Sequence, residues 1–253
     1  MTEAIRPFTC HVSDEVILDL KDRLARTRWP DQLPDAGWDY GTEKSFLQSL
    51  CEHWRDRFDW RAAEARFNAF PQFMTEIHGE QLHFYHVRSP EPDAVPLIIT
   101  HGYPGSVAEF LDILGPLSDP ARHGANPRDA FHVIAPSIPG YGFSGPTRHK
   151  GFNLEKAAEV NLRLMELLGY ERYMAQGGDW GAGISSAMAA KKPERLMALH
   201  LNFIVGFPPN PANPLAGLDE AERARVAWKA DYDLHEHGYR IIQSTSRNRW
   251  PTA

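Results

Sequence analysis

Between residues 95 and 203 the sequence alternates short apolar runs with segments of helical character. The apolar runs lie at 95–100, 131–135, 170–175 and 197–203, and the helix-like segments lie between them at 107–114, 154–168 and 182–191. A nearly continuous apolar run is typical of a strand that is buried on both faces. Strands that alternate with helices favour a parallel sheet covered by helices. The pattern therefore predicts an α/β fold with its core over residues 91–203.

Residues 1–90 have a different pattern, in which helices come before any strand. Apolar residues at helical spacing predict three helices, over 13–27, between Phe46 and Phe58, and after Asp59-Trp60. Alternation with a period of two over 73–77 and 81–87, around a turn at Gly79-Glu80, predicts an antiparallel hairpin. We therefore expect residues 1–90 to form a helical N-terminal arm followed by a hairpin.

Composition restricts the function classes that fit this chain. Its 253 residues are 42% hydrophobic, which is enough for the core of one domain with a short arm. The net charge is −6 and the sequence has no basic tract, so we do not expect nucleic-acid binding. Cys10 and Cys51 lie too far apart in sequence to suggest a disulfide framework, which favours a reducing, cytoplasmic location. No run approaches the ~18 apolar residues of a membrane span, so we expect a soluble protein without a membrane anchor.

An acidic residue occupies the turn between the third apolar run and the helix-like segment after it, in Gly177-Gly178-Asp179-Trp180-Gly181. A sharp strand-to-helix turn with small residues two positions before and after its centre is typical of a nucleophile elbow. The carboxylate of Asp179 would attack carbon by displacement and form an ester with the protein. A helix N-terminus behind the carboxylate would favour its ionised form by ~0.3–1 kcal/mol.

Two other interpretations of this segment stay open from its residues alone. One is a glycine-rich turn with no chemical role. The other is a dinucleotide-binding loop, which fits poorly because Ser186 stands where the pattern begun by Gly181 and Gly183 requires a third glycine or alanine.

Two loops after the neighbouring runs complete the candidate site. The segment 101–106, His-Gly-Tyr-Pro-Gly-Ser, follows the first apolar run, and Ser106 to Glu109 has the residues of a capping box. Backbone N–H groups in such a turn, together with that of Trp180 after the nucleophile, can stabilise a developing oxyanion. The Pro- and Gly-rich loop 136–144 follows the next run, and we expect it to shape the pocket without a chemical role.

We expect neither a cofactor nor a metal ion, because the sequence contains no phosphate loop, no His-Glu-x-x-His and no cysteine cluster. In His235-Glu236-His237 adjacent side chains would point in different directions on a helix, so a solvated surface is the better interpretation. Three further histidines lie in predicted strands and are expected to be structural, namely His83, His86 and His132.

The N-terminal arm carries the most specific resemblance to a known family. Residues 18–30, Leu-Asp-Leu-Lys-Asp-Arg-Leu-Ala-Arg-Thr-Arg-Trp-Pro, look like the first helix of the α/β-hydrolase-fold epoxide hydrolases, in the branch of the microsomal and juvenile-hormone-type enzymes. The resemblance continues to about residue 245, and it includes Trp54 with Asp59-Trp60 and His78-Gly79 with Leu82-His83-Phe84. A haloalkane dehalogenase, which also has Asp followed by Trp at its elbow, remains an alternative, but it would not carry this arm.

The resemblance implies an epoxide hydrolase that acts on a small-molecule epoxide. Asp179 would attack an epoxide carbon and form an alkyl-enzyme ester, and a histidine oriented by an Asp or Glu would activate water to cleave it. The N–H groups of Tyr103 and Trp180 would bind the oxyanion of that second step, and two tyrosines of a helical cap would protonate the departing epoxide oxygen. We expect the substrate to contact the same loops, at His101, Gly102, Pro104 and Trp180.

After the fourth apolar run the chain departs from the family's pattern. The start of the cap is expected over 204–253, and we identify no counterpart there of the family's acid, its histidine or its cap tyrosines, since Tyr239 matches none of these. We therefore expect a sheet that is incomplete on its C-terminal side, with exposed apolar surface and poor solubility. A non-catalytic fragment remains an alternative, and neither the specific epoxide nor the oligomeric state follows from the sequence.

The tail at residues 246–253 does not resemble the family, whereas residues 241–245 do. One permitted codon choice for this tail, read two bases later, encodes Pro-Gln-Pro-Leu-Ala-Tyr-Gly, which looks like the family's next segment. The hypothesis is a frameshift that truncates the product. The coding DNA tests it, because the absence of a homologous downstream frame would exclude a frameshift.

Overall fold

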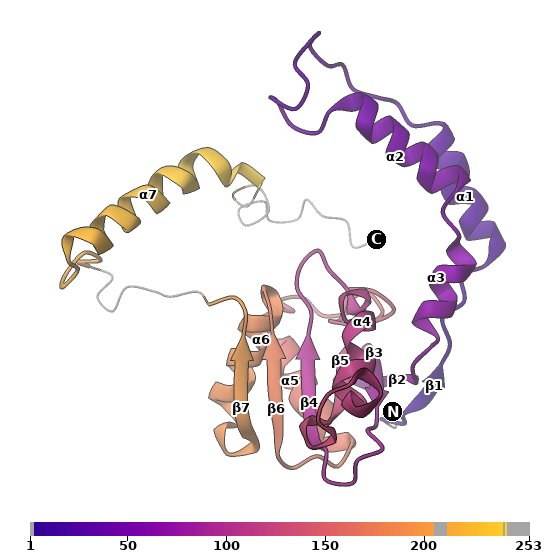
Figure 1. Cartoon of the computed structure of the whole chain (residues 1–253), viewed down its shortest axis with the longest axis vertical. Coiled ribbons are helices and arrows are strands. Elements are labelled where there is room, and N and C mark those ends of the chain that lie inside the picture. Colours follow the sequence, from indigo (N-terminus) through magenta and orange to yellow (C-terminus); the bar gives the residue numbers. More distant parts are fainter. Residues whose placement is uncertain (1–2, 205–211, 240, 242–253) are drawn as a thin grey trace.

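The architecture is a mixed seven-stranded sheet with helices on both faces, in a computed structural model that describes residues 3–204, 212–239 and 241 (Figure 1). The strand order is β1-β2-β3-β5-β4-β6-β7. The strands are β1 Arg6–Phe8, β2 Gln72–Ile77, β3 Glu80–Val87, β4 Val95–Thr100, β5 Phe131–Pro136, β6 Tyr173–Gly177 and β7 Leu196–Leu201. Strands β4 to β7 pair in parallel, as the sequence predicts, and the antiparallel strands β1 to β3 join them through β5.

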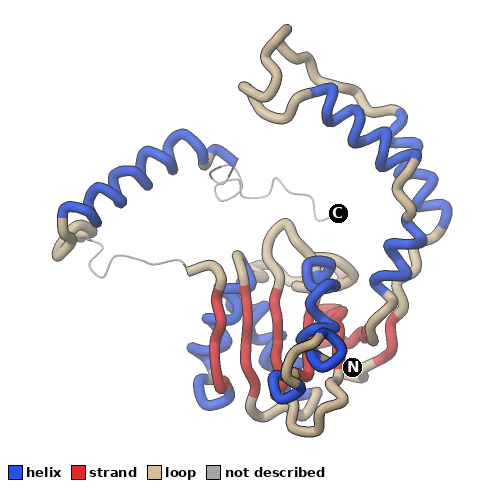
Figure 2. Tube along the Cα trace, in the orientation of Figure 1, coloured by secondary structure: helices blue, strands red, loops and turns tan. Residues whose placement is uncertain are grey.

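Each face of the sheet has its own apolar core, and Figure 2 shows the strands between the helices. Helices α5 (Leu154–Leu167) and α6 (Trp180–Lys191) bury side chains such as Leu164 and Ile184 against one face. Helix α4 (Leu111–Ser118) and a short 3-10 helix, Val107–Phe110, cover the other face. Consecutive residues of β4 divide between the two cores, with Ile98 in the first and Ile99 in the second. The apolar burial on both faces explains the nearly continuous apolar run of β4.

The hairpin of β2 and β3 forms as predicted, but its turn lies one residue earlier than Gly79-Glu80. Ile77 pairs with Glu80, so the two central residues of the turn are His78 and Gly79. Both have positive φ, 52° and 82°, which a two-residue turn needs to match the right-handed twist of its strands. The apolar alternation locates the strands. The position of the turn is set by His78 and Gly79, which both adopt a positive φ.

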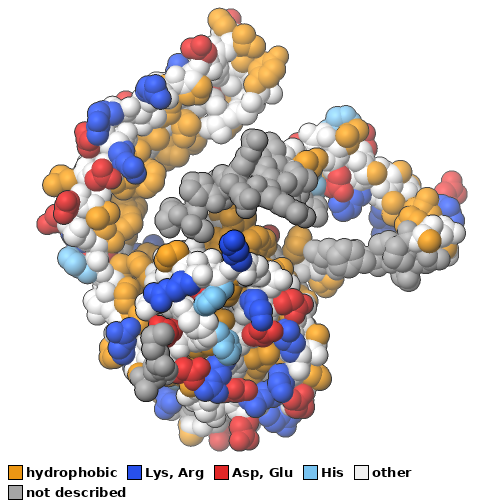
Figure 3. Space-filling view, turned by 180° about the vertical axis from the view of Figure 1, so that it is seen from behind, with side chains coloured by type: hydrophobic (Ala, Val, Ile, Leu, Met, Phe, Trp, Pro, Cys, Tyr) orange, Lys and Arg blue, Asp and Glu red, His pale blue; other side chains and the backbone are white. Residues whose placement is uncertain are grey.

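The N-terminal arm consists of α1 (Asp14–Ala25), α2 (Lys44–Asp56) and α3 (Trp60–Phe67), which agree with the three predicted helices. The side chains of Ser13, Glu43 and Asp59 accept N–H bonds at the three N-termini. The arm extends away from the sheet (Figure 1), and Figure 3 shows hydrophobic side chains gathered along it. Several of them are more than two-fifths exposed, including Val16, Leu18, Phe46, Leu50 and Trp54.

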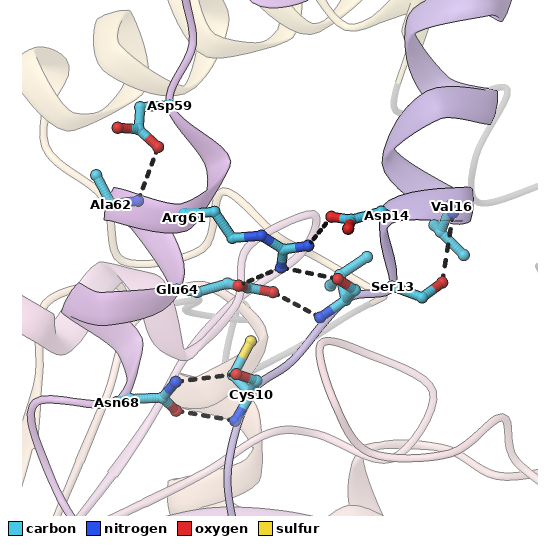
Figure 4. Close-up of polar contacts among 10 residues, drawn as sticks. Cys10, Ser13, Asp14, Val16, Asp59, Arg61, Ala62, Glu64 and Asn68 are labelled. Atoms are coloured by element: carbon cyan, nitrogen blue, oxygen red, sulfur yellow. Dashed lines mark hydrogen bonds and ion pairs between the residues drawn. The ribbon is translucent and has the colours of Figure 1, made fainter.

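The base of the arm is held by polar side chains of α3 that bond the backbone before α1 (Figure 4). Asn68 accepts the N–H of Cys10 at 2.8 Å and donates to its carbonyl at 2.9 Å. Glu64 accepts the N–H of Val12 at 2.5 Å, and Arg61 donates to the carbonyl of Val12 at 2.8 Å. Side chains on this side of α3 therefore bond the N–H and carbonyl groups of Cys10 and Val12, as the backbone of a neighbouring strand would.

The fourth apolar run forms β7, but the expectation that it is buried on both faces is wrong for the described residues. Its central residues are exposed, and β7 pairs with β6 on one side. Helix α7 (Glu220–Glu236) begins with a capping box between Asp219 and Glu222 and lies apart from the sheet (Figure 1). In the part of the chain that the structure describes, no helix has the length and apolar character to cross a membrane. The predicted frameshift tail, 246–253, lies outside the described residues.

Candidate active site

The turn at Asp179 is a strained strand-to-helix elbow. Strand β6 ends at Gly177 and helix α6 begins at Trp180, so two residues reverse the direction of the chain. Asp179 has φ 49° and ψ −122°, a backbone conformation that costs a non-glycine residue on the order of 1–3 kcal/mol. Such strain persists where the surrounding structure imposes it, and here it leaves the Asp179 side chain exposed at the carboxyl edge of the parallel strands.

The glycines on either side of Asp179 allow the close backbone approach that imposes this turn. A Cβ atom on Gly177 would lie 2.0 Å from the carbonyl oxygen of Gly181. A Cβ atom on Gly181 would lie 1.9 Å from the carbonyl oxygen of Thr100, at the end of β4. Neither backbone contact leaves room for a side chain. The spacing that suggested an elbow in the sequence therefore has a steric cause in the structure.

The Asp179 carboxylate is directed away from its own helix and toward the loop after β4. Asp179 is the N-cap residue of α6, yet its side chain accepts no capping bond from that helix. Instead Oδ1 accepts the backbone N–H of Tyr103 at 2.8 Å. Gly102 lies against the same side chain, because a Cβ atom there would be 2.6 Å from Cβ and 2.7 Å from Oδ1 of Asp179. Among the described residues Tyr103 is the hydrogen-bond donor recorded for this carboxylate, which leaves Oδ2 available.

The second expected oxyanion donor is the N–H of Trp180. Trp180 is the first residue of α6, where backbone N–H groups have no acceptor within the helix. This position is compatible with the expected role, and the role itself stays a prediction.

The capping box expected from Ser106 to Glu109 does not form. The hydroxyl oxygen of Ser106 accepts the N–H of Ala108 at 3.2 Å, one residue earlier than in a capping box. The helix begins with a 3-10 turn, Val107–Phe110, in which the backbone is wound more tightly than in an α-helix. The residue pattern thus predicts where the helix begins, but it does not predict that the first turn is a 3-10 turn.

Three aromatic rings next to the elbow contact one another. Tyr103 and Trp180 are stacked, with ring centroids 5.3 Å apart, and Tyr141 meets each of them edge-on at 6.1 Å. Burial raises the pKa of Tyr141, and the charges of Tyr103 and Asp179 add to this effect. Sequence reasoning gave the loop 136–144 a shaping role without naming Tyr141. An aromatic residue in the middle of a Pro- and Gly-rich loop after the adjacent strand was the available signal.

His101 is buried, and both of its ring nitrogens have partners within the protein. The residue is 1% exposed. Its Nδ1 lies 2.9 Å from the carbonyl oxygen of Gly102, and its Nε2 accepts the N–H of Ile138 at 3.0 Å. Burial lowers the pKa of His101, which keeps the ring neutral. Both nitrogens are thus used within the protein, and contact of this residue with a substrate stays a prediction.

The other expected contact residues divide between buried and open positions. Gly102 is buried beneath Asp179, Pro104 is exposed on the loop, and Trp180 is 41% exposed. Their contact with a substrate stays a prediction. In residues 3–204, 212–239 and 241 no group of three or more His, Cys, Asp or Glu side chains is placed to hold a metal ion. His235 and His237 each bond to an aspartate or a carbonyl of their own helix turn instead.

The strand histidines have internal partners, as expected. His83 bonds to Ser137 and Gln72, and His86 bonds to the hydroxyl of Tyr170. The Nδ1 atom of His132 accepts a backbone N–H.

Two family models match the sequence. The model described as "Epoxide hydrolase N terminus" covers residues 5–110, and the model described as "alpha/beta hydrolase fold" covers residues 95–237. A putative epoxide hydrolase of Stigmatella aurantiaca is 44% identical over 241 residues, which are 95% of this chain and 54% of that protein. Epoxide hydrolase 1 of Sus scrofa is 42% identical over 204 residues, which are 79% of this chain and 45% of that protein.

Solved structures of epoxide hydrolases are also similar to this chain. The juvenile hormone epoxide hydrolase of Bombyx mori has a TM-score of 0.84 at 32% identity, over 97% of this chain and 61% of that chain. The Aspergillus niger epoxide hydrolase has a TM-score of 0.81 at 34% identity, over 96% of this chain and 63% of that chain. This chain therefore spans about half the length of the curated relatives and less than two thirds of these structures.

Proposed function

Because this chain belongs to the α/β-hydrolase-fold family and carries the epoxide hydrolase N terminus, we propose that Asp179 is the nucleophile that opens an epoxide. The observation that carries the proposal is the hydrogen bond from the Tyr103 N–H to Asp179 Oδ1, made at a strained elbow. It divides the two carboxylate oxygens between two tasks. Oδ1 is held, and Oδ2 attacks.

In the first step Oδ2 forms a bond to one ring carbon of the epoxide, and the bond from that carbon to the epoxide oxygen breaks. The oxygen leaves as an alkoxide and takes a proton from solvent water, which leaves hydroxide, so the product is a 2-hydroxyalkyl ester of Asp179. Relief of ring strain drives this step. The exposed position of Asp179 admits a small epoxide to the carboxylate.

In the second step water attacks Cγ of the ester, and negative charge develops on Oδ1. The Tyr103 N–H already points at this atom from 2.8 Å, so it is placed to stabilise the charge without rearrangement. We propose the Trp180 N–H as the second donor. Collapse of the intermediate releases the diol and restores the carboxylate.

The second step also needs a base to deprotonate water. In the described part of the chain no histidine is recorded in hydrogen-bonding contact with Asp179, so we assign the base to no residue of this chain. For the 253-residue chain we therefore propose that the ester forms and then persists.

The test is incubation of the chain with styrene oxide, followed by intact-mass measurement and by assay of the diol. We expect an adduct that approaches one per chain in the wild type and is absent in Asp179→Asn. The matched control is Asp112→Asn, at a carboxylate whose side chain is 87% exposed and which should leave the adduct unchanged. Diol formed over many turnovers would show that the base lies in this chain and would overturn the persistence of the ester.

Absence of both adduct and diol would contradict the role of Asp179. Displacement of halide is the other chemistry that an elbow aspartate supports. The match of residues 5–110 to the epoxide hydrolase N terminus favours the epoxide. Halide release from a 1-haloalkane at a rate above that of adduct formation would reverse this preference.

A further inference from the structure

The direction of the Tyr103 N–H depends on the peptide unit to which it belongs. The carbonyl of Gly102 and the N–H of Tyr103 are the two ends of one planar trans peptide, so they point in opposite directions. The N–H end donates to Asp179 Oδ1 at 2.8 Å. At the carbonyl end, Gly102 accepts the backbone N–H of Gly105 at 2.9 Å and lies 2.9 Å from Nδ1 of His101. Contacts at the carbonyl end therefore set where the N–H end points.

The contacts of His101 fix which of its nitrogens carries the proton. A carbonyl oxygen can only accept, so Nδ1 must donate to Gly102. The Ile138 N–H can only donate, so Nε2 must accept. A ring that is 1% exposed and neutral, with its proton on Nδ1, satisfies both conditions. Protonation would place a second donor against the Ile138 N–H, and burial opposes that state.

We propose that His101 is a positioning residue, which clamps the Gly102–Tyr103 peptide from its carbonyl side and so aims the Tyr103 N–H at Asp179. Its bond to Ile138 anchors the ring on the loop that also carries Tyr141. The ring therefore connects the loops after β4 and β5, which are neighbouring strands of the sheet. The kinetic consequence rests on the proposed function of Asp179, whereas the geometric consequence does not.

Variants that keep one of the two His101 bonds distinguish a positioning role from a role in which the ring only fills space. His101→Asn keeps an amide donor near the position of Nδ1, within reach of the Gly102 carbonyl. His101→Gln places its amide near the position of Nε2, where it can accept from Ile138 but no longer holds Gly102. His101→Leu keeps the approximate bulk and removes both bonds.

The first measurement is the rate at which hydroxylamine cleaves the Asp179 ester, per folded molecule, in these three variants after reaction with styrene oxide. Attack on Cγ of the ester places negative charge on Oδ1, the atom that the Tyr103 N–H faces. Loss of an oxyanion donor typically costs about 10²–10³-fold, and a donor that is only misdirected should cost less. We expect His101→Gln and His101→Leu to lose about tenfold or more in rate, and His101→Asn to stay within about threefold of the wild type.

The matched control is His86→Gln, because His86 is also buried, at 8% exposed, and bonds through Nε2 to Tyr170. It pairs with Ile134 of β5, away from the edge where Asp179 lies. We expect this variant to lose stability without a slower cleavage of the ester by hydroxylamine. A rate that falls equally in His86→Gln, or equally in His101→Asn and His101→Leu, would overturn the proposal.

The second measurement does not need a reaction. The amide proton of Tyr103 donates to a carboxylate, so its NMR resonance should lie downfield and should move upfield in Asp179→Asn. We expect the same upfield move in His101→Leu and its reversal in His101→Asn. An unchanged Tyr103 resonance in His101→Leu would contradict positioning, even if Asp179 proves unreactive. A shifted resonance with no alkylation in the wild type would instead count against the proposed function alone.

Discussion

Helix α5 on the sheet and helix α2 of the arm are both amphipathic, but their surroundings differ strongly. Leu164 on α5 is fully buried, whereas Leu50 on α2 is 49% exposed. No residue of α1 or α2, both of which the structure describes in full, is buried. The elbow depends on backbone contacts within the packed core, while the base of the arm depends on polar side chains that bond the backbone before α1. An apolar stripe in a sequence thus predicts a helix, but it does not reveal what covers that helix.

The largest expected effect is at the elbow. Gly181→Ala would place a Cβ atom 1.9 Å from the carbonyl oxygen of Thr100, so either β4 or α6 must move. We expect a loss of more than about 4 kcal/mol in the free energy of unfolding, measured by chemical denaturation. Gly183→Ala is the control, because its Cβ atom would meet the flexible side chain of Leu154 at 2.8 Å. Equal stability of the two variants would contradict the steric account of the elbow.

A smaller loss is expected from the core of the sheet. Leu164→Ala removes a side chain that is 0% exposed and leaves a cavity between α5 and the strands. We expect it to lower the free energy of unfolding by about 2–5 kcal/mol. Urea unfolding followed by far-UV circular dichroism measures it, and a loss below about 1 kcal/mol would show that this core is loosely packed.

Loss of the Glu64 charge should loosen the base of the arm and leave the core of the sheet unchanged. The Val12 N–H and the Arg61 guanidinium hold the pKa of Glu64 below its usual range. A carboxylate with a lowered folded pKa stabilises above its unfolded pKa, near 4.5, and loses that contribution as pH falls through the folded pKa. We expect Glu64→Gln, or acidification below about pH 4.5, to make the arm more sensitive to limited proteolysis.

In the same samples the core should resist proteolysis as before, which is the internal control. Cleavage that begins in the core in Glu64→Gln would mean that the arm and the core unfold together.

The smallest expected effect is on the arm's exposed face. Leu50→Ala makes the same chemical change as Leu164→Ala but at a side chain that is 49% exposed. We expect a change within about 0.5 kcal/mol in the free energy of unfolding. A loss comparable to that of Leu164→Ala would show that another surface covers α2 in solution. It would contradict the difference in burial between the arm and the core of the sheet.

The sequence predicts most of the fold because its signals are local. Helix starts follow capping residues such as Ser13 and Asp59, and strands follow apolar runs such as the one at β4. Strand β1 is not predictable in this way, because Arg6–Phe8 has three residues with a proline and owes its existence to pairing with β2. The exposure of β7 also depends on which elements lie beside it, and the composition of the strand cannot show this.

The candidate site is predictable to the same degree. Asp179 follows from a spacing whose cause, the close approach at Gly177 and Gly181, is local. The placement of Tyr141 and the internal role of His101 depend on how two loops meet at one edge of the sheet, which no single segment encodes. His101 is next to the loop that holds Asp179, but adjacency in sequence does not say which way a ring points.

The measurement that tests the central claim most directly is location of the adduct after reaction with styrene oxide. Trypsin releases residues 173–191 as one peptide, in which Asp179 is the one carboxylate side chain. The account predicts that tandem mass spectrometry places the added mass on Asp179, and that hydroxylamine, which cleaves esters, removes it. An adduct that resists hydroxylamine, lies on another residue, or persists in Asp179→Asn would contradict the assignment of Asp179 as the nucleophile.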